Sequence, residues 1–334
     1  MKVLIHFNVH RDKKLFEAEQ LKRHIIAACE DCAINYVEKH EKNVSIANFI
    51  SLNQSSTNLI RFYVERSVPT LLWMFYANTD ADAEIIKTRK NGEKYIPKSR
   101  LALINMMDAI IVPSNEAKLY LWKLKVRIPV FIARNGVKED YYNNLKKIGK
   151  EPFVRYFRID EKQKYVVSVV PINKRREKLQ LLNKLAKSVP NHNFYVFVSA
   201  KNTVFSKMKL RRLDRYTARN LIVSPIVRED VYRSGLYGAS YFLDSGDDKF
   251  GLMSLVEVIA AKTPVIIEEK AAFLDILQKE SAYFRVGYEE IRDVLLSNAD
   301  SNDKIAAAIR YTTKNTRANF TNAVCELFTK IYHR

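Results

Sequence analysis

The chain has 334 residues, of which 47% are hydrophobic, and its 56 lysines and arginines outnumber its 37 acids to give a formal net charge of +19. This length predicts two domains, the hydrophobic content excludes global disorder, and the positive charge favours an anionic partner such as nucleic acid, an acidic membrane surface or a phosphorylated substrate. The three cysteines, an odd and low number, favour a reducing compartment, and no apolar run approaches the roughly 20 residues that cross a bilayer.

The first part of the chain alternates between apolar runs and amphipathic stretches. The apolar runs predict buried strands at residues 2–9, 33–37, 70–76, 109–113 and 129–133. The patterns with helical spacing predict helices at 14–29, 46–52 and 114–122, the last of them capped by Ser114. Such β-α-β alternation is typical of a doubly wound parallel sheet.

A polar segment at 143–164 interrupts the pattern and is predicted to be a connector. A second α/β series follows, with strands expected at 165–170, 194–199, 220–224, 241–245 and 264–268, and helices at 177–189, about 251–261 and 320–332. We therefore expect an N-terminal domain over 1–150 and a second domain over 151–315. Because ligands of open parallel sheets bind at the carboxyl ends of the strands, functional residues should lie in the strand-to-helix loops.

One loop and the helix after it carry candidate chemistry. The loop at 244–249 precedes a predicted helix that begins near Gly251, and the free N–H groups of such a helix end suit a diphosphate. Glu257 stands two turns further on, inside an apolar run, so its charge needs either solvent or a partner. A carboxylate there could accept hydrogen bonds from ribose hydroxyls, and the alternative is a side chain that simply reaches solvent.

The segment YFLDSGDDKFGLMSLVEVIAAKTPVII, at 241–267, resembles the donor-site signature of retaining glycosyltransferases with the GT-B fold, of the family 4 type. The positions that match this signature in order are Ser245, Phe250, Gly251, Leu252, Leu255, Glu257, Ala260, Pro264 and Val265. Asp248 stands where the first acid of the signature is expected, and Lys262 replaces the usual glycine. The two acids are nine residues apart here and eight in the family.

Other segments resemble the same family in the same order. They are 108–121, 131–137, 165–199 and 228–245, and Gly136 in the second of them is expected to have a special backbone angle. The resemblance implies a GT-B fold, with two Rossmann-like doubly wound domains that face a cleft. It also implies that a C-terminal helix, in 316–334, crosses back to the N-terminal domain.

The resemblance assigns roles to individual residues. Basic side chains after the first strand of the second domain would hold the leaving diphosphate, and they are Lys174, Arg175 and Arg176, with Lys178 as a spare. Helix N–H groups of Phe250, Gly251 and Leu252 would assist, Glu257 would hold the ribose, and Asp248 would touch the sugar hydroxyls. Fixed cations can stabilise a leaving diphosphate without a metal, so we expect a UDP-sugar as substrate, no metal and no other cofactor.

The first half departs from the family pattern. The loop after the first strand lacks the glycines of many relatives, and Asn78 or Thr79 stands after 70–76 where relatives often have histidine. We take Asn78 and Asp80 as acceptor-side candidates. A basic and apolar run at 118–127 suits an anionic lipid interface through Lys118, Trp122, Lys123, Lys125 and Arg127. Alternatively, its apolar residues belong to the core and its charges form a solvated face.

Basicity and short length make the sequence most similar to bacterial enzymes that glycosylate diacylglycerol or glucosyl-diacylglycerol. We therefore expect a cytoplasmic, peripheral membrane enzyme on the inner face of the plasma membrane, which transfers a hexose from a UDP-sugar to a lipid-linked or glycan acceptor. Alternatives are a glycosyltransferase for a cell-surface polysaccharide or other glycoconjugate, a glycosyltransferase-like scaffold without catalysis, and a basic nucleic-acid-binding protein. No nucleic-acid recognition motif supports the last of these.

Overall fold

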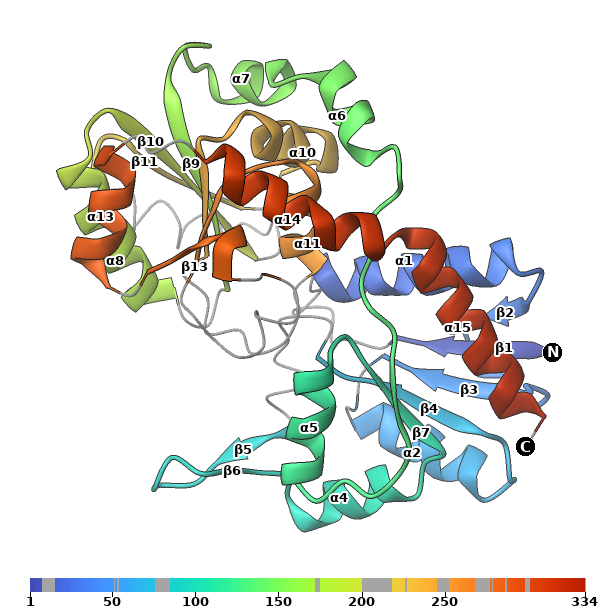
Figure 1. The fold of residues 1–334 in the computed structure, drawn as a ribbon. Helices are drawn as coiled ribbons and strands as arrows, with labels where there is room; N and C mark the ends of the chain where they lie inside the picture. Colours follow the sequence, from blue (N-terminus) through green and yellow to red (C-terminus); the bar gives the residue numbers. More distant parts are fainter. Residues whose placement is uncertain are drawn as a thin grey trace. The chain divides into compact units, whose positions relative to one another are not determined.

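The structure is a computed structural model that describes residues 1–7, 16–50, 52, 54–75, 85–171, 175–199, 218–225, 227–244, 253–267, 277, 279–285, 287–297 and 301–333. The described chain divides into two compact units, each built on a parallel six-stranded sheet (Figure 1). The first unit contains the chain up to Gly136 and again from Asn315, and the second contains most of the chain between them.

The first sheet has the strand order β2-β1-β3-β4-β7-β8. Its strands are β1 (Lys2–His6), β2 (Asn35–Val37), β3 (Ile46–Phe49), β4 (Thr70–Trp73), β7 (Ala109–Val112) and β8 (Val130–Ile132). Helices α1 (Phe16–Asp31) and α15 (Arg317–Tyr332) share one hydrophobic core with it. A second core contains α2 (Gln54–Val64), α4 (Lys98–Asn105) and α5 (Asn115–Lys123), and a hairpin of β5 (Lys87–Thr88) and β6 (Lys94–Tyr95) precedes α4.

The second sheet has the order β11-β10-β9-β12-β13-β14. Its strands are β9 (Lys164–Pro171), β10 (His192–Ser199), β11 (Leu221–Pro225), β12 (Tyr241–Asp244), β13 (Val265–Ile267) and β14 (Tyr283–Phe284). Helices α8 (Arg175–Ser188) and α13 (Tyr288–Ser297) pack on one face. Aromatic side chains of the other face contact α7 (Glu151–Phe157) and α10 (Glu229–Gly238). The unit also contains α6 (Tyr141–Ile148), α11 (Met253–Ala260), a 3-10 helix (Lys279–Ser281) and α14 (Asn302–Lys314).

These sheets confirm the prediction of two doubly wound α/β layers. The prediction of a helix over 46–52 is wrong, because Ile46–Phe49 is the strand β3. All four of its residues are buried, and a short run that is apolar on both faces has no period that separates strand from helix. The polar segment at 143–164 is more than a connector, since α7 and most of α6 lie in it.

The last helix, α15, belongs to the first unit, as the resemblance implies. It packs against α1 and β3, and Phe320, Val324 and Phe328 contribute to the core beneath it. Thr316 caps its first turn by accepting a hydrogen bond from the Asn319 N–H. The helix is therefore an integral layer of the first unit, although the chain reaches it only after passing through the second.

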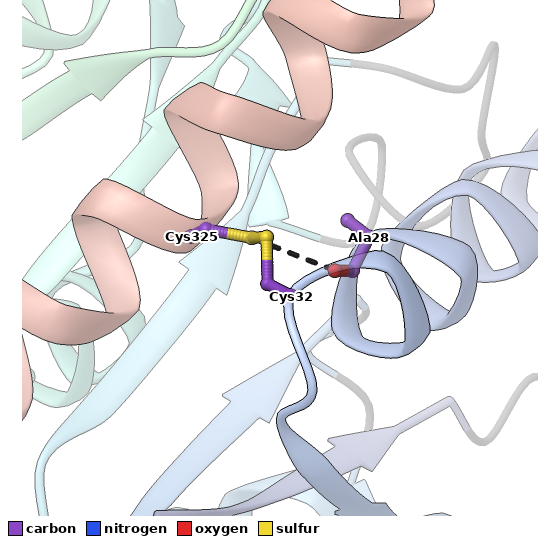
Figure 2. The surroundings of a disulfide bond; sticks show 3 residues. All are labelled: Ala28, Cys32 and Cys325. Atoms are coloured by element: carbon purple, nitrogen blue, oxygen red, sulfur yellow. Dashed lines mark hydrogen bonds between the residues drawn. A yellow bond between two sulfur atoms is a disulfide. The ribbon is translucent and has the colours of Figure 1, made fainter.

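A disulfide also joins α15 to the rest of the first unit. Cys325 in α15 is bonded to Cys32, which follows α1, and the Cys325 Sγ atom lies 3.5 Å from the carbonyl oxygen of Ala28 (Figure 2). The third cysteine, Cys29, is buried as a free thiol. The disulfide is not what the expectation of a reducing compartment predicts, since paired cysteines are rare there.

Gly136 has a role other than the expected one. Its backbone is not among the left-handed positions of the described chain, so a special angle does not explain the glycine. Instead the backbone of Asn315 and Thr316 passes directly over it, at the point where the chain returns to the first unit. The absence of a Cβ atom is what this approach requires.

Candidate functional site

The strand order of the second sheet indicates at which edge of the sheet a ligand would bind. The chain adds β10 and β11 on one side of β9, then moves to the other side for β12, β13 and β14. Ligands of such sheets bind outside the carboxyl ends of the strands at this switch point, here beside the ends of β9 and β12. The segment after β9 contains Lys174, and the segment after β12 opens the donor-site signature.

Two buried charged residues lie at this edge. Asp244 ends β12, and Lys178 belongs to the first turn of α8, the helix that follows β9. Both side chains are buried. Since a buried charge is retained only with a partner, the edge is a polar site within an otherwise apolar layer.

The predicted diphosphate-binding residues fall partly within the described chain. Arg175 and Arg176 are the first two residues of α8, so the sequence places them at a helix N-terminus, where an anion is stabilised. Lys174, Asp248, Phe250, Gly251 and Leu252 lie outside the described residues, as do Asn78 and Asp80. Their proposed roles remain predictions.

Glu257 has a partner. It is the fifth residue of α11 and is only 5% exposed, so the alternative that its side chain reaches solvent is wrong. Its Oε1 atom accepts a hydrogen bond from Nη2 of Arg233 in α10, at 2.9 Å. The charge within the apolar run is therefore balanced by a cation that lies 24 residues earlier in the chain.

Arg233 itself is held from three sides. The same Nη2 atom lies 2.7 Å from Oε1 of Glu229, and the guanidinium carbon lies 5.3 Å from the centre of the Tyr141 ring. Burial, with a further contribution from the Glu257 carboxylate, raises the pKa of the Tyr141 hydroxyl well above its usual value. The group that sequence reasoning missed is Arg233, since nothing in the segment 228–245 distinguishes one arginine as a partner for Glu257.

The lysine that replaces the signature glycine ends α11. Lys262 has a left-handed backbone with φ of 59°, its N–H donates to the Ile259 carbonyl, and the N–H of Thr263 donates to that of Val258. This pair of hydrogen bonds is the common helix ending in which glycine is preferred at the left-handed position. The glycine of the family signature therefore corresponds to a position that needs a left-handed backbone. Lys262 adopts the same backbone conformation at a cost in conformational energy.

The basic run at 118–127 has both a core side and an exposed side. Ala117 and Leu121 of α5 are buried, whereas Leu119 and Trp122 are exposed, Trp122 by 56%. The ammonium of Lys118 lies 5.6 Å from the centre of the Trp122 ring, and Lys123, Lys125 and Arg127 are exposed. The Arg127 N–H donates to Asn105, which brings the end of α4, with its exposed Met106, beside this surface. The reading in which every apolar residue of the run belongs to the core is therefore wrong.

Two features that the sequence analysis does not expect, a membrane span and a metal site, concern the described part of the chain. None of its helices combines the length and the apolar character that a membrane span needs. Among the same residues, no three His, Cys, Asp or Glu side chains lie close enough together to hold a metal ion.

Comparisons with known proteins fit this architecture. No family model matches the sequence. The chain is 25% identical over 175 residues to the processive diacylglycerol α-glucosyltransferase of Acholeplasma laidlawii, a match that spans 52% of each protein and so about half the length of that relative. This relative confirms the similarity to diacylglycerol glucosyltransferases that the sequence analysis takes from basicity and short length.

The solved structures extend the likeness to nearly the whole chain. A glycosyltransferase from Rickettsia africae superposes with a TM-score of 0.65 at 14% identity, covering 99% of this chain and 98% of the other. Anabaena HepE, solved in complex with UDP and glucose, superposes with a TM-score of 0.70 at 10% identity, covering 99% and 100%. The chain therefore has the GT-B fold that the resemblance implies.

Proposed function

We propose that the protein is a retaining glycosyltransferase that transfers a hexose from a UDP-sugar to a lipid-linked acceptor, such as diacylglycerol or glucosyl-diacylglycerol. The observation that carries the proposal is the switch point of the second sheet, where the donor-site signature leads into α11 and its buried Glu257. The Acholeplasma laidlawii relative, a diacylglycerol α-glucosyltransferase by name, supports the acceptor class. Structures of HepE with UDP-glucose support the donor class.

Each residue of the donor site has a chemical task. Negative charge develops on the diphosphate as the glycosidic bond to the sugar breaks, and fixed cations placed beforehand stabilise that charge. Lys174, Arg175 and Arg176 supply the cations, and the N–H groups of Phe250, Gly251 and Leu252 supply helix-end donors. Glu257 accepts hydrogen bonds from the ribose and Asp248 from the sugar, while Asn78 and Asp80 serve the acceptor side. The reaction so described needs no metal and no cofactor besides the donor.

The exposed surface of α5 is the proposed membrane contact. Trp122 and Leu119 would enter the interface between headgroups and acyl chains, and Lys118, Lys123, Lys125 and Arg127 would attract anionic headgroups. A lipid-linked acceptor is presented at such a surface, so one surface serves both binding and substrate access. The proposal therefore includes a peripheral location on the inner face of a bacterial plasma membrane.

The test is UDP release from UDP-glucose, with and without anionic vesicles that contain glucosyl-diacylglycerol. Release that requires the vesicles supports both the activity and the membrane surface, and product analysis then gives the linkage. Binding of UDP without release on any acceptor lipid contradicts the lipid acceptor and favours either another glycoconjugate acceptor or a scaffold without catalysis. Absence of UDP binding contradicts the proposal as a whole, and strong salt-dependent binding of nucleic acid would then favour that alternative.

A pair of variants tests the donor assignment. Glu257→Ala should reduce turnover by roughly tenfold or more, because a charged hydrogen-bond acceptor for the ribose is lost. Glu139→Ala, which removes an exposed acid of the same unit, is the matched control and should keep full turnover. Equal activity of the folded Glu257→Ala protein contradicts the ribose role.

A further inference from the structure

Arg233 and Glu257 occupy equivalent places on neighbouring helices. Each is the fifth residue of its helix, Arg233 in α10 and Glu257 in α11. Both helices connect parallel strands of one sheet and so begin at the carboxyl edge of that sheet. Four residues of helix rise correspond to about 6 Å, so both side chains start about one turn from the edge where a ligand binds.

The contacts fix one oxygen of the carboxylate. Oε1 of Glu257 lies 2.9 Å from Nη2 of Arg233, and that nitrogen is held in turn by Glu229 at 2.7 Å. The ring of Tyr141, from α6, lies beside the guanidinium. Arg233 is therefore anchored independently of Glu257, by a second acid on its own helix and by an aromatic ring.

Burial determines what Arg233 does for the acid. A carboxylate that is 5% exposed would take up a proton if it had no cation beside it, because desolvation penalises the charged form. A protonated carboxyl is a weaker acceptor and has a choice of orientations, whereas an ion-paired carboxylate is a strong acceptor with one orientation. The strength with which Glu257 can accept a hydrogen bond thus depends on Arg233.

We infer that Arg233 is a positioning residue for nucleotide recognition: it holds the Glu257 carboxylate charged and fixed so that this carboxylate discriminates ribonucleoside diphosphates from their 2′-deoxy counterparts. The inference rests on the proposed function, since it takes Glu257 to be the ribose acceptor. The new element is Arg233: the preference for UDP over 2′-deoxy-UDP would depend on this residue, although it acts through Glu257 and not on the nucleotide itself.

The experiment measures the dissociation constants of UDP and of 2′-deoxy-UDP by titration calorimetry and compares their ratio between variants. The wild-type protein should bind UDP roughly tenfold more tightly than 2′-deoxy-UDP. In Arg233→Met this ratio should fall toward one. The control is Arg228→Met, which should keep the wild-type ratio. It removes an exposed arginine that precedes α10 and forms an ion pair with the exposed Asp230.

The outcomes distinguish a failure of the proposed function from a failure of the inference about Arg233. Failure of the wild-type protein to bind UDP overturns the proposed function and the inference with it. A folded Arg233→Met protein that keeps the wild-type ratio overturns the inference alone, because a purely structural role lowers the melting temperature without changing the ratio.

A second variant covers a failure to fold. In Arg233→Met the buried Glu257 either stays charged without its cation or takes up a proton, and both lower the stability, so the double variant with Glu257→Gln should fold where the single variant does not. Because Arg233 acts through Glu257, the ratio in the double variant should equal that of Glu257→Gln alone. A further loss in the double variant overturns the inference, since Arg233 would then act on the nucleotide directly.

Discussion

A Cβ atom added to Gly136 would lie 2.2 Å from the carbonyl oxygen of Thr316. That oxygen belongs to backbone next to the first turn of α15, so it cannot move without moving the helix. The glycine at 136 is thus required by a crossing of two chain segments rather than by a turn.

Gly136→Ala should therefore lower the free energy of unfolding by about 1–3 kcal/mol, the usual cost of overpacking a rigid site. Urea titration followed by tryptophan fluorescence measures it. Gly92→Ala is the comparison: Gly92 has φ of 82° and nothing within 4 Å of an added Cβ, so only the left-handed backbone costs energy there, about 1 kcal/mol. A smaller loss at 136 than at 92 would contradict the steric explanation.

Replacement of Lys262 separates its backbone cost from its side-chain contact. The Lys262 ammonium lies 3.7 Å from the centre of the Tyr142 ring, so Lys262→Ala loses that contact and keeps the left-handed strain. Lys262→Gly loses the contact and relieves the strain. We expect the glycine variant to be more stable than the alanine variant by about 1 kcal/mol in urea titrations. Equal stabilities would mean that the helix ends differently in solution.

His192 should make the protein less stable in mild acid. Burial, followed by the nearby Lys164 charge, lowers the pKa of His192. Neither ring nitrogen has a hydrogen-bond partner within the described chain. Below its normal pKa of about 6.5 the unfolded chain binds a proton that the folded protein resists, so the free energy of unfolding falls as the pH is lowered.

The check compares unfolding free energies at pH 7.5 and 5.5. The wild-type protein should lose up to about 1 kcal/mol more over this interval than His192→Gln, which cannot titrate. The exposed His333 is the control site, and His333→Gln should lose as much as the wild-type protein. An identical loss in His192→Gln and the wild type would contradict the assigned pKa direction.

We expect the exposed surface of α5 to bind anionic vesicles. Trp122→Ala should weaken cosedimentation with anionic vesicles several-fold, and Lys118→Gln and Lys123→Gln should each weaken it by roughly fivefold at low salt. Tyr156→Ala is the matched control, since Tyr156 of α7 is also 56% exposed but lies in the second unit. If the tyrosine variant loses as much binding as the tryptophan variant, the membrane contact lies elsewhere.

The disulfide makes a prediction about stability. Cys325→Ser should lower the free energy of unfolding by about 2–4 kcal/mol, because the bond to Cys32 restricts the unfolded chain. Dithiothreitol should produce the same loss in the wild-type protein and none in the variant.

Alkylation under non-reducing conditions should label only Cys29, and only after denaturation, because burial raises the pKa of that thiol to about 12. Three labelled thiols in the untreated protein would contradict the pairing.

Much of the fold could be read from local patterns. Most strands of both sheets appear as apolar runs, although the two-residue β14 does not, and Ser114 does cap α5 by accepting a hydrogen bond from the Ala117 N–H. The strand β3 is predicted as a helix because all four of its residues are buried, so the sequence shows no alternation of apolar and polar residues. Helices α6 and α7, of eight and seven residues, are too short for a helical period to emerge from a polar segment.

The candidate site was less predictable, because its partners are distant in sequence. The signature identifies Glu257, but its pairing with Arg233 depends on how α10 lies beside α11. The reason for Gly136 lies 180 residues further along the chain, at Thr316. Likewise, no local pattern predicts the disulfide, because Cys32 bonds to a residue 293 positions away.

The bond between Cys32 and Cys325 also changes the topology of the polypeptide. It closes the chain from Cys32 to Cys325 into a ring that includes all of the second unit, whereas β1 and α1 of the first unit and the last residues of α15 lie outside it. A protease that cuts once anywhere within this ring opens it without releasing a fragment, so the product migrates as one molecule until it is reduced. A nicked form of this protein would therefore be visible only on a reducing gel.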